Sequence, residues 1–116
     1  MPKMRMHVAH VFLGALQFEL IQPAGGDDAL YRDFCPDDPN AIRLHHLGMW
    51  LDHEAEFARV SAALREQHID VVFESFIPEL GGTIYADARA SLGHYLEYVV
   101  MSADAKSRYY AEVPQY

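Results

Sequence analysis

The sequence predicts an α+β fold in which helices cover one face of a curved, mostly antiparallel sheet. Two observations carry this prediction: short β-prone segments that end at glycine or proline recur along the chain, and one long amphipathic helix lies in its second half. The 116 residues give room for one core, because single domains are commonly built from about 100 to 150 residues. We therefore expect residues 1–116 to form a single domain.

The first part of the chain is predicted to be a β-hairpin. Residues 7–13 and 16–21 are β-prone, and Gly14-Ala15 between them supplies a tight turn. Pro23 is expected to end the second strand, so that residues 7–23 form one hairpin.

Residues 24–42 are predicted to connect this hairpin to the rest of the chain. The stretch is rich in glycine, aspartate and proline. Asp27 or Asp28 is expected to cap a short helix that runs through Phe34 before Pro36 breaks it.

Residues 43–116 are predicted to form a βαβββ module followed by a terminal helix. The most regular element is the helix over residues 54–68, in which Phe57, Val60 and Leu64 recur at three- and four-residue steps. Asp52 is the expected N-cap of this helix. The other predicted elements are strands over 43–51, 69–77, 83–89 and 94–101, a turn at Gly81-Gly82, and a helix that Ser102 caps and Pro114 ends.

Alternation along three of these strands gives each strand one potential ligand. Successive side chains point to opposite faces, so Glu19, His46 and Glu97 lie opposite the more apolar residues of their strands. The apolar residues, which we expect to face the helices, are Phe18 and Leu20, then Leu47, Met49 and Leu51, then Leu96, Tyr98 and Val100. If the opposite face is concave, the three ligand side chains converge there.

Four segments resemble strand motifs of the glyoxalase, bleomycin resistance protein and extradiol dioxygenase superfamily, also called the vicinal oxygen chelate superfamily, which includes methylmalonyl-coenzyme A epimerase. The segments are LQFELIQP at 16–23, LHHLG at 44–48, GGTIY at 81–85 and GHYLEY at 93–98. The resemblance covers nearly the whole chain after residue 7. It implies βαβββ modules that curl into an incomplete barrel around a divalent metal ion. It further implies that Glu19, His46 and Glu97 are ligands of that ion, which would be Zn, Ni, Co, Mn or Fe.

The chain departs from this superfamily at its start. Members with two modules in one chain open with a strand that carries a first histidine ligand and then a helix, whereas residues 7–23 match only the last two strands of a module. We therefore expect either an N-terminally shortened chain or a homodimer in which a second copy completes the sheet, because open strand edges invite pairing. Water, His7 or His10 is expected in place of the missing ligand.

The resemblance also implies a reaction. Carboxylate and imidazole ligands hold divalent cations and leave positions for a small substrate with two adjacent oxygens. The expected activity is that of a lyase or epimerase that removes a neighbouring C–H proton, with Glu97 alternating between ligand and base. Three alternatives stay open: an extradiol-type dioxygenase using Fe(II), a non-catalytic protein that binds an antibiotic-type ligand, and a shortened relative that folds and dimerises without a function of this kind.

Composition argues against several other classes of function. The formal net charge of −8 repels phosphate backbones, so no nucleic-acid partner is expected. No run approaches the roughly 20 apolar residues of a membrane span, and no secretory signal is evident, so we expect a cytoplasmic protein without a membrane partner. Cys35 is the only cysteine, which excludes an intrachain disulfide and a multi-thiolate zinc site.

Overall fold

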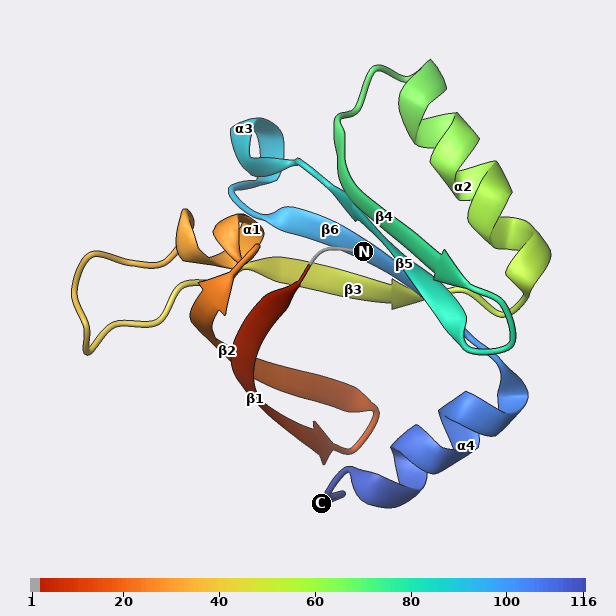
Figure 1. Cartoon of the computed structure of the whole chain (residues 1–116), viewed down its shortest axis with the longest axis horizontal. Coiled ribbons are helices and arrows are strands. Elements are labelled where there is room, and N and C mark those ends of the chain that lie inside the picture. Colours follow the sequence, from red (N-terminus) through yellow and green to blue (C-terminus); the bar gives the residue numbers. More distant parts are fainter. Residues whose placement is uncertain (1–2) are drawn as a thin grey trace. The chain divides into compact units, whose positions relative to one another are not determined.

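The computed structural model describes residues 3–116, which form six strands and four helices in two units. Unit 1 contains the described residues up to Arg43 together with Tyr109–Tyr116, and unit 2 contains Leu44–Arg108. Each unit has its own sheet (Figure 1), a two-stranded one in unit 1 and a four-stranded one in unit 2. The predicted α+β class is confirmed, with two sheets where one was expected.

Unit 1 is built on an antiparallel hairpin of β1 (Met4–Leu13) and β2 (Leu16–Gly26). Gly14 has a φ of 61°, which a tight turn requires and glycine adopts without steric cost. The predicted hairpin and its turn are therefore confirmed. The prediction that Pro23 ends the second strand is wrong: β2 continues past it, because proline is tolerated in a strand that has an open edge.

The connector holds one helical turn, α1 (Ala29–Arg32). Asp28 occupies its N-cap position, but the side chain makes no capping bond. Its buried carboxylate instead accepts a hydrogen bond from the backbone N–H of Gly25 at 2.8 Å and pairs with Arg32. The expected capping role of Asp28 is therefore wrong, and the helix ends before Phe34.

Unit 2 contains a sheet with the strand order β3-β6-β5-β4. Its strands are β3 (His46–Trp50), β4 (Val71–Ile77), β5 (Gly81–Ala86) and β6 (Tyr95–Met101). β3 and β6 are parallel, whereas β4-β5 and β5-β6 are antiparallel. The parallel pair is possible because the chain between β3 and β4 crosses over through a helix.

That helix, α2 (Glu54–Glu66), covers one face of the four-stranded sheet (Figure 1). Phe57 and Leu64 pack against Ile84 of β5 and Val100 of β6 in the main hydrophobic core. Leu96 and Tyr98 adjoin this core, as does Leu51 just after β3. The helix-facing set predicted for β6 is therefore confirmed.

Two local predictions about α2 are wrong. His53, not Asp52, occupies the N-cap position, and its side chain makes no capping bond. The helix stops two residues before His68, whose φ of 58° breaks the helical backbone. The N–H of Ile69 then closes the end by donating to the carbonyl of Leu64 at 2.9 Å.

The return from β4 to β6 also differs from the prediction. The turn lies at residues 78–80, where Glu79 has a φ of 69°, and Gly81 and Gly82 already belong to β5. The strand predicted over residues 83–89 ends at Ala86, and its last predicted residue, Arg89, begins a helical turn, α3 (Arg89–Leu92). The Asp87 carboxylate accepts hydrogen bonds from the Arg89 backbone and guanidinium, each at 3.0 Å, and so favours a turn over a strand there.

The last helix, α4 (Ala103–Glu112), begins as predicted. The hydroxyl of Ser102 accepts a hydrogen bond from the backbone N–H of Ala105 at 3.1 Å, which is a capping bond. The boundary between the two units falls within α4. Among the described helices, none has the length and apolar character that a membrane crossing requires.

Some residues predicted to face helices are exposed. Phe18 is 46% exposed, Leu20 61% and Leu47 50%. Leu47 lies on β3, an outer strand of its sheet, and Phe18 and Leu20 lie on the hairpin of unit 1. These three residues lie on the strand face opposite the polar residues, as predicted. The expectation that helices cover them is wrong.

Candidate functional site

His46 and Glu97 face each other on neighbouring strands of unit 2. β3 and β6 run parallel with Gly48 opposite Glu97 and His46 opposite Tyr95, which places the histidine and the glutamate on the same face of the sheet. Nε2 of His46 lies 3.4 Å from Oε1 of Glu97. Only 12% and 19% of these side chains are exposed. Unit 2 thus brings together two of the three predicted ligands.

The carboxylate of Glu97 is oriented from two sides. The hydroxyl of Thr83, on β5, donates a hydrogen bond to Oε2 at 2.9 Å, which leaves Oε1 directed at His46. Gly48 provides the necessary room, because a Cβ at that position would lie 3.2 Å from Oε1. Glu97 is therefore positioned as one member of a two-atom donor pair.

The ring of His46 is also held on both of its nitrogens. Nδ1 lies 2.9 Å from Nδ1 of His45, while Nε2 faces Glu97. Burial, and then the charge of His94, lowers the pKa of His46 to about 4, so the imidazole is neutral at pH 7. When Nδ1 donates its proton to His45, Nε2 presents a lone pair beside the carboxylate, and that is the form in which histidine binds a metal.

Aromatic rings surround this histidine pair. His45 stacks on Tyr95 with ring centroids 4.8 Å apart, and Tyr85 meets His46 edge to face at 5.2 Å. Both tyrosines are buried. The rings fix the imidazole planes and limit the access of water to them, which preserves the lowered pKa of His46.

Glu19, the third predicted ligand, is paired within unit 1. Oε2 of Glu19 lies 3.3 Å from Nε2 of His10, and 27% of each side chain is exposed. The two residues stand directly opposite each other in the hairpin, His10 on β1 and Glu19 on β2. The expected meeting of Glu19 with His46 and Glu97 stays a prediction. Within residues 3–116, no group of three or more metal-binding side chains has been identified.

The pairing of His10 with Glu19 was within reach of the sequence. A turn at Gly14-Ala15 pairs Leu13 with Leu16, and counting outward along both strands pairs His10 with Glu19. Thr83 had no such signal, because its role depends on the register between β5 and β6 rather than on any local motif.

The donor atoms of both pairs suit a divalent ion. Two ligands that each lie about 2.0 to 2.1 Å from a tetrahedral ion are about 3.3 to 3.4 Å apart. The two Nε2-to-carboxylate distances, 3.3 Å in unit 1 and 3.4 Å in unit 2, have this spacing. It is long for a strong charge-assisted hydrogen bond, which is typically about 2.7 to 2.9 Å.

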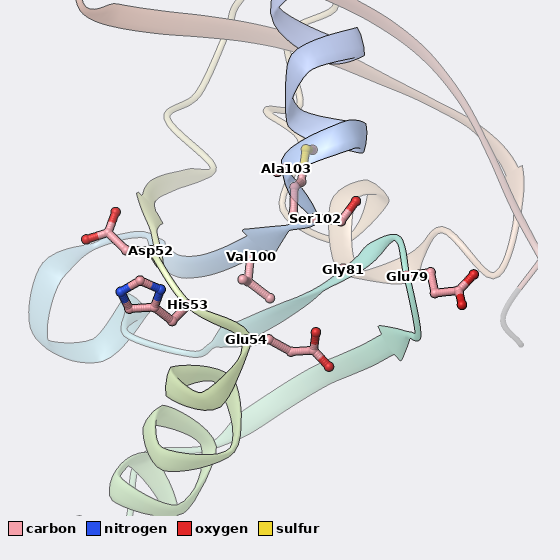
Figure 2. A pocket seen from close by; sticks show the side chains of 9 residues that line it. Asp52, His53, Glu54, Glu79, Gly81, Val100, Ser102 and Ala103 are labelled. Carbon is pink, nitrogen blue, oxygen red and sulfur yellow. The ribbon is translucent and has the colours of Figure 1, made fainter.

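A separate hollow of about 220 Å³ lies in unit 2 (Figure 2). It is formed where β3 leads into α2, where β4 turns into β5, and where α4 begins. The carboxylates of Asp52, Glu54 and Glu79 and the ring of His53 lie around it. None of the three predicted ligands lines this hollow.

No family model matches the sequence, and no curated protein matches it significantly. The geometry of the two histidine–glutamate pairs and the four strand motifs are therefore the features of this chain that indicate a function.

Proposed function

We propose that this chain is a glyoxalase-like, divalent-metal-dependent lyase or epimerase that acts on a small substrate with two adjacent oxygens. The observation that carries the proposal is the His46–Glu97 pair, in which a neutral imidazole nitrogen and a carboxylate oxygen lie 3.4 Å apart in a half-buried setting. Glu19 is the proposed third ligand, as the strand motifs imply.

The spacing of these two donors supports a cation at this position, because Nε2 of His46 and Oε1 of Glu97 lie 3.4 Å apart, as two ligands of one tetrahedral ion do. In the tautomer that donates from Nδ1, Nε2 is a nitrogen donor beside the carboxylate of Glu97, and together they favour a positive charge between them. A second proton does not supply that charge at pH 7, because the pKa of His46 is about 4. A divalent ion does, and when bound it stabilises negative charge on the oxygens of a chelated substrate.

Glu97 is the proposed base. Thr83 holds one carboxylate oxygen at 2.9 Å, so the other is the oxygen that accepts a proton from a substrate C–H bond. In a lyase of the glyoxalase kind, Glu97 returns that proton to the neighbouring carbon, whereas in an epimerase a second acid delivers a proton to the opposite face of the same carbon. The aromatic rings of Tyr85 and Tyr95 beside the pair limit water, which would otherwise compete for the proton.

Proton exchange tests this proposal. Metal-loaded protein is incubated in D₂O with a panel of small 2-hydroxy ketones and 2-hydroxy acids, and deuterium incorporation beside the oxygens is followed by NMR. We expect exchange with wild type and a loss of at least a hundredfold in Glu97→Gln, whose amide cannot accept the proton. Exchange that is equal in the two proteins contradicts the role of Glu97.

Non-catalytic binding of a small cationic ligand is the second candidate function. The net charge of −8 favours it, because a negative field concentrates cations. If the chain has this function, purified protein retains no metal. Substitution of Glu19, His46 or Glu97 then does not change the metal content.

We also propose that the chain is a homodimer, with the hairpin of unit 1 as the interface. Leu13, Leu16, Phe18 and Leu20 share one face of β1 and β2 and are 46% to 61% exposed. The apolar neighbours of Glu97 on β6 differ from the apolar neighbours of Glu19 on β2. Leu96 and Tyr98 are partly buried, because they pack against the core that α2 completes.

A second copy is the occupant that suits this face. The paired residues on it, from His7 and Gln22 to the turn, include no aspartate, glutamate, lysine or arginine, so two acidic chains can approach there. A patch of this kind is self-complementary about a twofold axis. Exposed apolar patches above roughly 300 to 600 Å² are characteristic of interaction surfaces.

A further inference from the structure

We propose that Lys106 binds a carboxylate group of the substrate, so that the substrate is a small acid with two adjacent oxygens and a second, distal carboxylate. The inference rests on the proposed function, because it names the substrate class of the site at His46 and Glu97. All of these residues belong to unit 2. The observation that carries it is a half-buried ammonium group held over the ring of Trp50, on the strand of His46.

Strand β3 places Trp50 on the sheet face that carries His46 and Glu97. Alternate residues of a strand share a face, so His46, Gly48 and Trp50 project together. Leu51, the next residue, packs against the core on the helix-covered face. Gly48 stands opposite Glu97 in the register of β3 with β6, and Trp50 is two residues further along. The indole therefore follows the carboxylate of Glu97 along one face.

Helix α4 holds Lys106 over this indole. Ser102 caps the helix, and the backbone N–H of Lys106 donates to the carbonyl of Ser102 at 2.9 Å in the first turn. The ammonium nitrogen lies 5.0 Å from the centroid of the Trp50 ring, which is a cation–π contact. Both side chains are half-buried. The helix cap and the ring thus fix one positive charge near the end of β3.

The ammonium group of Lys106 forms no ion pair within residues 3–116. Asp104, on the same turn of α4, lies 3.7 Å from Arg108 instead. The chain has 17 acidic residues against 9 lysines and arginines, so it does not lack carboxylates with which Lys106 could pair. A half-buried charge is stabilised by an opposite charge. A carboxylate on a ligand would supply that charge and accept a charge-assisted hydrogen bond.

The positions of Glu97 and Trp50 set the length of the substrate. Two residues of strand span roughly 6.6 Å. In 2-oxopentanedioate the distal carboxylate oxygens lie about 4 Å from the carbon that loses a proton, and a charge-assisted hydrogen bond adds about 2.8 Å. Such a ligand would extend over Gly48, where a Cβ would lie 3.2 Å from Oε1 of Glu97. Glycine at this position therefore leaves room for the ligand beside the proposed base.

A matched pair of ligands tests the role of Lys106. 2-Oxopentanedioate and 2-oxopentanoate share the adjacent oxygens and the C–H bond beside them, and they differ only in the distal carboxylate. Trp50 is the single tryptophan of the chain, so its fluorescence reports binding beside Lys106. We expect the dicarboxylate to have a dissociation constant at least tenfold lower than that of the monocarboxylate, because only the dicarboxylate bonds to the ammonium group.

Three variants assign this preference to one residue. Lys106→Met removes the charge but keeps an unbranched side chain, and it should reduce the preference to less than twofold. Lys106→Arg keeps the charge and should retain the preference within threefold. The matched control is Arg108→Met, which removes a positive charge from an exposed position of the same helix and should leave the preference within twofold. The ratio of the two dissociation constants is unaffected if part of a variant is unfolded.

Deuterium exchange by metal-loaded protein separates this inference from the proposed function. If Lys106→Met keeps the wild-type preference while Glu97→Gln loses exchange, the role of Lys106 is overturned and the proposed function stands. If Lys106→Met loses the preference while Glu97→Gln exchanges as wild type does, the carboxylate site stands and the role of Glu97 fails. A wild type without any preference for the dicarboxylate overturns the inference, since Lys106 then only holds α4 against Trp50.

Discussion

At the scale of single residues, the proposed chemistry of this chain depends on how two imidazoles are held. Nδ1 of His10 lies beside Tyr109 and Gln17, and Nδ1 of His46 lies beside His45. Nε2 of each histidine is directed at a carboxylate. The supporting groups, Thr83 behind Glu97 and Tyr109 behind His10, come from other elements than the residues they orient. Substitution of a supporting group should therefore change the affinity for the proposed metal ion while the fold persists.

The buried imidazole of His46 makes the stability of the metal-free protein depend on pH. Its pKa is about 4 in the folded chain and about 6.5 in the unfolded chain. Below pH 6.5 the unfolded state takes up a proton that the folded state does not, so the free energy of unfolding falls until pH 4. We expect a loss of about 2 to 3 kcal/mol from this group, measured by urea denaturation after metal removal.

The control for this prediction is His46→Gln, which cannot titrate. Carboxylates elsewhere also change stability over this range, so the informative quantity is the difference in slope between wild type and variant. Equal slopes between pH 6.5 and pH 4 would show that His46 has no lowered pKa.

At the scale of elements, α2 is the helix on which unit 2 depends. Leu64 is buried against Ile84 and Val100, so Leu64→Ala leaves a cavity in the main core. We expect the free energy of unfolding to fall by about 2 to 5 kcal/mol, measured by urea denaturation. Arg59→Ala, an exposed site on the same helix, should change it by less than about 0.5 kcal/mol. An equal effect of the two substitutions would contradict the assigned core.

The sequence predicted elements whose signals are local. The helix around Phe57 and Leu64 has a strong apolar period, and the hairpin has a two-residue turn with glycine, so both are found where expected. Helix α3 was missed because hydrogen bonds between Asp87 and Arg89, not an apolar pattern, turn the chain there.

Burial was harder to predict than orientation. The alternation in β2 correctly separates Glu19 from Phe18 and Leu20, but alternation does not show whether another element covers the apolar face. Of the candidate site, alternation predicts the faces on which His46 and Glu97 lie. The contact between them and the support from Thr83 do not follow from it, because both depend on registers between strands that no local pattern encodes.

At the scale of the whole molecule, the exposed apolar face of the hairpin determines the proposed assembly. Leu20→Glu places a charge at the centre of that face and should convert a dimer into a monomer, with dissociation at least tenfold easier. Analytical ultracentrifugation over a range of concentrations measures this. Leu92→Glu is the matched control, since Leu92 is 56% exposed in unit 2, compared with 61% for Leu20. A wild type that is monomeric at high concentration excludes the proposed interface.

The most direct test of the central claim is the amount of metal that the chain retains. Protein purified without chelator is analysed for Zn, Ni, Co, Mn and Fe, alongside Glu19→Ala, His46→Ala and Glu97→Ala, each checked for folding by circular dichroism. We predict one divalent ion per chain in wild type and little or none in each folded variant. Metal-free wild type that also binds none of these ions on titration, or folded variants that keep a full equivalent, would contradict the account.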